Sequence, residues 1–203
     1  MSKRFIALAG NIGAGKTELC QFLCRRYGLE PFYEPNEQNP YLADFYGDMK
    51  AYAFRSQIYF LTHKFRLHRQ LEESPGAAVQ DRTIYEDAEI FAQNLFRQRL
   101  IDKRDWQTYS ELYRVIQKSL RPPDLMIYLR APVRTLRQRI RRRNRDFEQG
   151  VPAAYLRRLN ELYEDWMGRY ELSPLVVLES DRLDYLTDLV DRIDVLGQVE
   201  KYL

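Results

Sequence analysis

A glycine-rich loop near the N-terminus sets the strongest limit on how this chain can fold. The apolar run at residues 5–9 predicts a buried strand, and residues 16–27 carry Leu19, Phe22 and Leu23 at helical spacing. Between the two lie residues that match GxxxxGK[ST] at every specified position, namely Gly10, Asn11, Ile12, Gly13, Ala14, Gly15, Lys16 and Thr17. The sequence therefore predicts a strand, a phosphate-binding loop and a helix in direct succession.

The residue types in this loop suit ATP and a magnesium ion. Glycines let backbone N–H groups close around phosphate oxygens, and the start of the following helix adds partial positive charge. Lys16 can reach the β- and γ-phosphates, and the Thr17 hydroxyl can ligate Mg²⁺. A glycine turn without a ligand is the alternative, which the complete motif and its context disfavour. The loop does not identify the acceptor, because kinases, ATPases and GTPases share it.

Four later apolar runs predict further buried strands, at residues 32–33, 77–79, 125–129 and 175–178. Longer helical patterns separate them, the clearest at residues 153–170. Strands that alternate with helices indicate an α/β fold, in which helices cover both faces of a mostly parallel sheet. We expect one domain over residues 1–203, with ligands at the carboxyl ends of the strands.

Composition disfavours several other classes of protein. The excess of 32 basic over 29 acidic residues is too small to indicate a nucleic-acid binder. No apolar stretch reaches the roughly 18 residues of a membrane span. Cys20 and Cys24, the only cysteines, fit neither a disulfide framework nor a CxxC site. We therefore expect a cytoplasmic protein that binds neither nucleic acid nor membranes.

Motifs outside the loop resemble those of one enzyme family. They are Glu34-Pro35, Gln57-Ile58-Tyr59, the run QDRTIYED at residues 80–87 and the arginine-rich residues 139–145. Their order and spacing resemble the deoxynucleoside kinase family, especially its bacterial deoxyadenosine, deoxyguanosine and deoxycytidine kinase branch. The resemblance extends from the phosphate loop to about Trp166. Thr83 replaces a more usual serine, and Phe147 stands where an acid often occurs.

The resemblance implies a fold and a reaction. The fold is that of the P-loop kinases, with a five-stranded parallel sheet and an arginine-rich lid at about residues 139–150. The reaction transfers the γ-phosphate of ATP, with Mg²⁺ as cofactor, to the 5′-hydroxyl of a deoxynucleoside in nucleotide salvage. A homodimer is also implied. Residues 57–59 and 80–87 look closest to the bacterial branch, so we expect deoxyadenosine as acceptor first, and deoxycytidine or deoxyguanosine next.

The resemblance also assigns the reaction centre, which includes Lys16 of the loop. Glu34 matches the general base that acts on the 5′-hydroxyl, although an ordinary surface glutamate is the alternative. Asp81 matches a carboxylate associated with the metal, and Arg82 matches an arginine at the transferring phosphoryl group. For Asp81 the alternative is a helix-capping aspartate with nearby salt bridges.

Further positions match the family's nucleoside site. Gln57 and Phe91 match residues that pair with the base and cover its face. Asp87 matches a position that tunes base preference, and Lys64 is expected to pair with it; a helix-dipole contact is the alternative for Asp87. Tyr46 and Glu148 match residues that hold the sugar, and Tyr46 would disfavour ribonucleosides. Aromatic residues such as Tyr46 and Phe91 are otherwise more often core residues.

Eight arginines and no acid occur between residues 130 and 145. A nucleic-acid patch, a solvated helix face and a lid over ATP are the possible interpretations. The family resemblance favours the lid, in which Arg139, Arg143 and Arg145 would clamp the phosphates. We expect the others to be solvated or salt-bridged: Arg130, Arg134, Arg137, Arg141 and Arg142.

Two other functions combine similar motifs. A nucleoside-monophosphate kinase, such as a thymidylate kinase, would need a second cationic phosphate site near the second strand, where this chain has Glu34. A nucleotide-binding module that has lost catalysis would show a damaged reaction centre, whereas Lys16, Glu34, Asp81 and Arg82 are all present. Both alternatives are therefore disfavoured.

Overall fold

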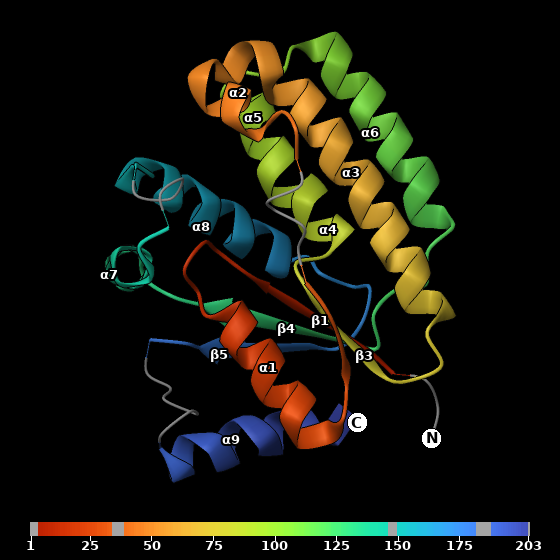
Figure 1. The fold of residues 1–203 in the computed structure, drawn as a ribbon, viewed down its shortest axis with the longest axis vertical. Coiled ribbons are helices and arrows are strands. Elements are labelled where there is room, and N and C mark those ends of the chain that lie inside the picture. The colour runs from red at the N-terminus through yellow and green to blue at the C-terminus, as the bar shows by residue number, and fades with distance from the viewer. Residues whose placement is uncertain (1–3, 34–38, 146–149, 182–187, 203) are drawn as a thin grey trace.

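The computed structural model describes residues 4–33, 39–145, 150–181 and 188–202 (Figure 1). Glu34 and Glu148, two of the predicted site residues, lie outside this part of the chain. Tyr46 is described only by its backbone, which lies in α2. The predictions for these three residues therefore rest on the sequence.

A five-stranded parallel sheet forms the centre of the molecule, as predicted. Its strands lie in the order β2-β3-β1-β4-β5, and every neighbouring pair is parallel. They are β1 (Phe5–Gly10), β2 (Glu30–Phe32), β3 (Ala78–Asp81), β4 (Leu125–Arg130) and β5 (Leu175–Glu179). β3 continues past its apolar run through Gln80 and Asp81, because both polar residues are buried at the carboxyl end of the strand.

Helices cover both faces of the sheet (Figure 1). They are α1 (Lys16–Tyr27), α2 (Leu42–Gly47), α3 (Met49–Glu73), α4 (Ile84–Glu86), α5 (Gln93–Arg97), α6 (Lys103–Lys118), α7 (Val133–Arg143), α8 (Ala153–Met167) and α9 (Leu189–Val199). A π-helical segment, Asp87–Ala92, joins α4 to α5. α8 stops three residues before the predicted end at residue 170. None of the described helices has the length and apolarity needed to cross a membrane.

The alternation of side chains along β1 divides the core into two layers. Phe5, Ala7 and Ala9 pack into the larger layer, beneath α3, α6 and α8. Ile6 and Leu8 face the opposite layer, which contains residues of α1 and α9. Because β1 is the middle strand, the loop after it emerges between the ends of β3 and β4. This order brings the phosphate loop and the residues that follow β3 to the same edge of the sheet.

Candidate active site

A cavity of about 560 Å³ lies at the carboxyl ends of the strands. One part of its wall is the phosphate loop, from Ile12 to Thr17, and another is formed by residues of α3 and of the segment after β3. The predicted site residues that line it are Ile12, Gly13, Ala14, Gly15, Lys16, Thr17, Gln57, Asp81, Arg82, Asp87, Phe91, Arg143 and Arg145. Residues from widely separated parts of the sequence thus converge on one space large enough for small-molecule ligands.

The glycines of the loop are required by its close packing. Gly10 has φ 156°, and a Cβ atom there would lie 2.9 Å from the carbonyl oxygen of Leu129 on β4. Gly13 has φ 81°, and a Cβ atom there would lie 2.9 Å from the carbonyl oxygen of Leu136 on α7. The Lys16 ammonium group folds back over the loop and donates hydrogen bonds to the carbonyls of Gly10 at 2.7 Å and Asn11 at 3.2 Å.

The two predicted metal ligands are in direct contact. The Thr17 hydroxyl donates to Asp81 Oδ2 over 2.8 Å, which places both oxygens at the mouth of the loop. Asp81 Oδ1 is buried and has no hydrogen-bond partner in the described part of the chain. No group of three or more His, Cys, Asp or Glu side chains suited to a metal occurs among the described residues. This sparse oxygen set fits Mg²⁺, which commonly takes one or two protein oxygens and completes its shell with phosphates and water.

Arg82 follows β3 in a left-handed backbone conformation, with φ 64°. Its carbonyl accepts a hydrogen bond from Lys64 Nζ at 2.8 Å, and its guanidinium carbon lies 4.4 Å from the centre of the Phe91 ring. Such a backbone costs on the order of 1–3 kcal/mol, so the neighbouring contacts must hold it in place. The result is an arginine whose side chain lies against the cavity wall beside Asp81.

The predicted pair between Lys64 and Asp87 is confirmed. Lys64 Nζ lies 3.3 Å from Asp87 Oδ2, and the two side chains are 0% and 6% exposed. Gln57 is also buried, and its Oε1 atom has no hydrogen-bond partner among the residues described here. Gln57, Asp87 and Phe91 all line the cavity, whereas Lys64 lies behind Asp87.

The arginines of the arginine-rich segment lie in different surroundings. Arg143 and Arg145 line the cavity near the end of α7. Arg139 is not among the lining residues, because its guanidinium donates to the Ala14 carbonyl at 3.0 Å and to Ser180 behind the loop. Arg130 is salt-bridged to two glutamates, and the remaining arginines are exposed, as expected: Arg134, Arg137, Arg141 and Arg142.

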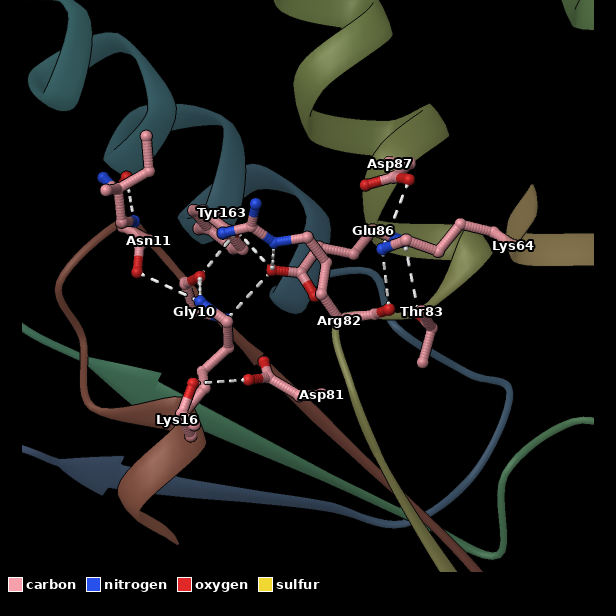
Figure 2. A network of polar contacts seen from close by, with 12 residues as sticks. Gly10, Asn11, Lys16, Lys64, Asp81, Arg82, Thr83, Glu86, Asp87 and Tyr163 are labelled. Atoms are coloured by element: carbon pink, nitrogen blue, oxygen red, sulfur yellow. Dashed lines mark hydrogen bonds and ion pairs between the residues drawn. The ribbon is translucent and has the colours of Figure 1, made fainter. Parts of the chain in front are cut away.

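Sequence reasoning did not single out Glu86 or Tyr163, which join the loop to Arg82 (Figure 2). Glu86 Oε1 accepts hydrogen bonds from the Gly10 N–H at 3.1 Å and from the Tyr163 hydroxyl. Burial raises the pKa of Glu86, and the positive charges of Arg82 and Lys16 oppose this shift. Glu86 lies within the QDRTIYED run, but a buried acid and an exposed one look alike in a sequence. Tyr163 belongs to the apolar stripe of α8, which indicates a core residue.

Comparison with known sequences agrees with this site. The sequence model of the family "Deoxynucleoside kinase" matches residues 6–203. The chain is 34% identical to a deoxyadenosine/deoxycytidine kinase of Bacillus subtilis (strain 168) over 196 residues, which are 96% of this chain and 90% of the relative. It is 36% identical over 204 residues to a deoxyguanosine kinase of Lactobacillus acidophilus, covering 96% of this chain and 88% of that one.

Solved structures resemble the fold over nearly the whole chain. A deoxyadenosine kinase from M. mycoides with bound dATP superposes with a TM-score of 0.83 at 30% sequence identity, covering 97% of this chain and 99% of that one. The same enzyme with bound dCTP gives a TM-score of 0.81 and covers 98% and 100% of the two chains. The phosphate loop, the parallel sheet and the extent of these matches show that the chain belongs to the deoxynucleoside kinase family, whose members are ATP-dependent phosphotransferases.

Proposed function

We propose that this kinase phosphorylates the 5′-hydroxyl of deoxyadenosine most efficiently, and that of deoxycytidine or deoxyguanosine next. The observation that carries the proposal is the single cavity that both the phosphate loop and the Gln57, Asp87 and Phe91 wall line. A donor phosphate on the loop and a nucleoside base on that wall would share one enclosed space. The names of the bacterial relatives support the same acceptors.

At the phosphate end, the cationic side chains stabilise the charge of the transferring group. Lys16 exchanges its hydrogen bonds with loop carbonyls for contacts with phosphate oxygens. Arg82 presents a guanidinium beside Asp81, and Arg143 and Arg145 approach from the end of α7. Positioning and charge stabilisation dominate phosphoryl transfer, so these four cations carry most of the acceleration. Arg139 instead fixes the back of the loop through the Ala14 carbonyl.

Thr17 and Asp81 would hold the Mg²⁺ ion that accompanies ATP. The ion supplies neutralisation of charge on the phosphate oxygens, and the buried, unpartnered Oδ1 of Asp81 supports a cation at this point. The chain's own contribution is to keep the hydroxyl and the carboxylate 2.8 Å apart before ATP arrives. Preorganised ligands of this kind need no rearrangement during the reaction.

At the acceptor end, Gln57 and Asp87 recognise the base edge and Phe91 covers its face. Gln57 supports this role because it is 5% exposed and its Oε1 atom has no partner in the described part of the chain, which leaves an acceptor for a base amino group. From the family resemblance we assign Glu34 as the base that orients and deprotonates the 5′-hydroxyl. The same resemblance assigns Tyr46 and Glu148 to the sugar, so ribonucleosides are poorer acceptors.

The family resemblance also supports a homodimer in the cytoplasm, without nucleic-acid or membrane partners. α6 exposes two apolar side chains on its outer side, Leu112 at 40% and Val115 at 64%. Apolar residues in such positions are suited to a contact with a second copy. Sedimentation equilibrium tests this assembly, which has twice the chain mass of 24.4 kDa.

The replacement Asp87→Asn tests the proposed base wall. It keeps the shape of the side chain but removes the charge that faces Lys64. We expect kcat/KM to redistribute among deoxyadenosine, deoxyguanosine and deoxycytidine by about tenfold or more, because sites built on hydrogen bonds discriminate strongly. The KM for Mg-ATP should change little.

The matched control for this experiment is Glu89→Gln, two residues further along the same π-helical segment. Glu89 is bonded to Arg169 and does not line the cavity. Removal of the Asp87 charge could destabilise the fold, because Lys64 is buried beside it. The thermal unfolding midpoints of both variants show whether the enzyme is still folded. If Asp87→Asn changes kcat/KM by the same factor for all deoxynucleosides, or if thymidine is the best substrate of the wild type, the assignment of Gln57, Asp87 and Phe91 to the base is wrong.

A further inference from the structure

The buried carboxyl group of Glu86 has no part in the chemistry assigned so far. Glu86 is the last residue of α4 and is 0% exposed, at the junction of the phosphate loop, α4 and α8. Burial of an acid costs stability, and an apolar residue of similar size would fill the same space at lower cost. The contacts of this carboxyl group indicate what it contributes instead.

Three groups meet at a single oxygen of Glu86 (Figure 2). Oε1 accepts the Gly10 N–H at 3.1 Å, where the loop leaves β1. It also accepts the hydroxyl of Tyr163 from α8, which lies 2.9 Å from the Gly10 carbonyl. The third group is Arg82 Nε, at 3.6 Å. One atom therefore connects the donor-binding loop to the arginine beside the transferring phosphoryl group.

These contacts restrain the Arg82 guanidinium on two sides. Glu86 lies beside Nε, and the Phe91 ring covers the guanidinium face at 4.4 Å. The backbone of Arg82 is held independently by Lys64, through the hydrogen bond to its carbonyl. Since Glu86 also binds Gly10, any displacement of the loop relative to Arg82 must break a buried, charge-assisted contact.

We propose that Glu86 is a positioning residue, which holds the phosphate loop and Arg82 in fixed register for phosphoryl transfer and is itself oriented by the Tyr163 hydroxyl. This inference rests on the proposed role of Arg82. Displacements of about 1 Å can cost on the order of 10²-fold in rate, so such a link affects turnover more than substrate binding. Burial raises the pKa of Glu86, and the nearby cations Arg82, Lys16 and Lys64 favour its charged form.

The test is a double-mutant cycle in kcat between Glu86→Gln and Arg82→Lys. Glu86→Gln keeps the size of the side chain and an acceptor oxygen for Gly10 but removes the charge beside Arg82. We expect Glu86→Gln to lower kcat by about tenfold or more, while the KM values for deoxyadenosine and Mg-ATP stay within about threefold. In the Arg82→Lys background, the same replacement should cost less than about threefold, because the group on which Glu86 acts has changed.

A second variant keeps the proposal testable if Glu86→Gln does not fold. Tyr163→Phe removes one hydroxyl and should lower kcat by about threefold or more. In the Arg82→Lys background its effect on kcat should again be smaller than in the wild type. Tyr128→Phe is its matched control, because the Tyr128 ring stacks on Tyr163 at 5.6 Å and its hydroxyl bonds Glu164 away from the loop. We expect this control to retain kcat within about twofold.

Two results would overturn the inference and are distinguishable from failure of the proposed function. If folded Glu86→Gln and Tyr163→Phe keep wild-type kcat, or if their effects add fully to that of Arg82→Lys, Glu86 is only a structural residue. If Arg82→Lys alone keeps wild-type kcat, the role of Arg82 is wrong, and the inference fails with it.

Discussion

At the scale of single residues, the site depends on side chains that hold strained or charged neighbours. Arg82 keeps a φ of 64° because Lys64 binds its carbonyl, and Lys64 is itself neutralised by Asp87. Asp87, proposed to recognise the base, is thus linked through one buried cation to Arg82, proposed to act at the phosphates. Substitution of Asp87 or Arg82 should therefore affect the contact between the other two residues as well as its own contacts.

Lys16 provides the simplest test at this scale. Lys16→Ala should lower kcat by on the order of 10³-fold, because it removes a cation that stabilises charge in the transition state. The fold should persist, since the hydrogen bonds from the ammonium group to the Gly10 and Asn11 carbonyls lie within the loop. Steady-state turnover and thermal unfolding measure the two effects.

The matched control is Lys103→Ala, at an exposed position at the start of α6. It removes the same charge at a residue that does not line the cavity, so kcat should be unchanged. Near wild-type turnover in Lys16→Ala would show that the phosphate loop does not contribute to phosphoryl transfer.

At the scale of elements, the phosphate loop and α7 are packed as one unit. Gly13 approaches the carbonyl of Leu136, and Arg139 reaches from α7 to the Ala14 carbonyl. α7 ends with Arg143 and leads to Arg145, both on the cavity wall. The position of these two cavity-lining arginines is therefore coupled to the conformation of the loop.

Gly13→Ala tests this coupling. The new Cβ would lie 2.9 Å from the Leu136 carbonyl and 3.0 Å from Ile140 Cγ1, and φ 81° disfavours any side chain there. We expect a loss of roughly 1–3 kcal/mol in unfolding free energy and a KM for Mg-ATP raised by about tenfold. Denaturant unfolding and initial rates at varied ATP measure these quantities.

Gly76→Ala is the control for Gly13→Ala, because a Cβ atom at Gly76 meets nothing within 4 Å. Its stability should lie within roughly 0.5 kcal/mol of the wild type. An unchanged KM for Mg-ATP in Gly13→Ala would show that α7 is independent of the loop.

The elements were predictable from sequence to the extent that local patterns determine them. The complete loop motif predicts β1 and α1 with correct helix bounds, and apolar runs locate the other four strands, although β2 begins at Glu30 and shares only Phe32 with the predicted residues 32–33. The end of β3 was missed because Gln80 and Asp81 are polar, and only the tertiary structure shows that they are buried. The sequence alone did not show that Arg139 turns behind the loop, because the neighbouring arginines are indistinguishable in the sequence. Only the tertiary structure brings Ser180 close enough to accept hydrogen bonds from Arg139.

At the scale of the whole molecule, the buried residue His68 lies at the end of the sheet opposite the cavity. The cavity lies at the carboxyl ends of the strands. His68 lies near the other end, where it packs edge-on against Phe5 at the start of β1 and bonds the Arg121 carbonyl at 2.9 Å. Titration at this end should alter stability without altering the site.

Burial lowers the pKa of His68 in the folded state below the ordinary 6.5. The unfolded chain therefore takes up this proton first, and the free energy of unfolding falls as the pH drops below about 6.5, by up to about 1.4 kcal/mol per pH unit. His68→Gln keeps a donor for the Arg121 carbonyl and should flatten this slope between pH 7 and 5. Urea unfolding across this range measures it.

His63→Gln is the control, since His63 is half-buried on α3 and stacks on Tyr59 at 4.2 Å. It keeps His68 and shows how the removal of another imidazole from the same helix affects the slope. An equal slope in wild type and His68→Gln would show that His68 is not the group responsible.

The proposed function requires that the cavity accept an uncharged deoxynucleoside opposite the phosphate loop. The most direct measurement compares kcat/KM for deoxyadenosine, adenosine and deoxyadenosine 5′-monophosphate with Mg-ATP, and identifies each product by mass spectrometry. We expect deoxyadenosine to be the best of the three acceptors and to yield the 5′-monophosphate, with adenosine poorer and the monophosphate not phosphorylated. A higher kcat/KM for the monophosphate, with the diphosphate as product, would contradict it.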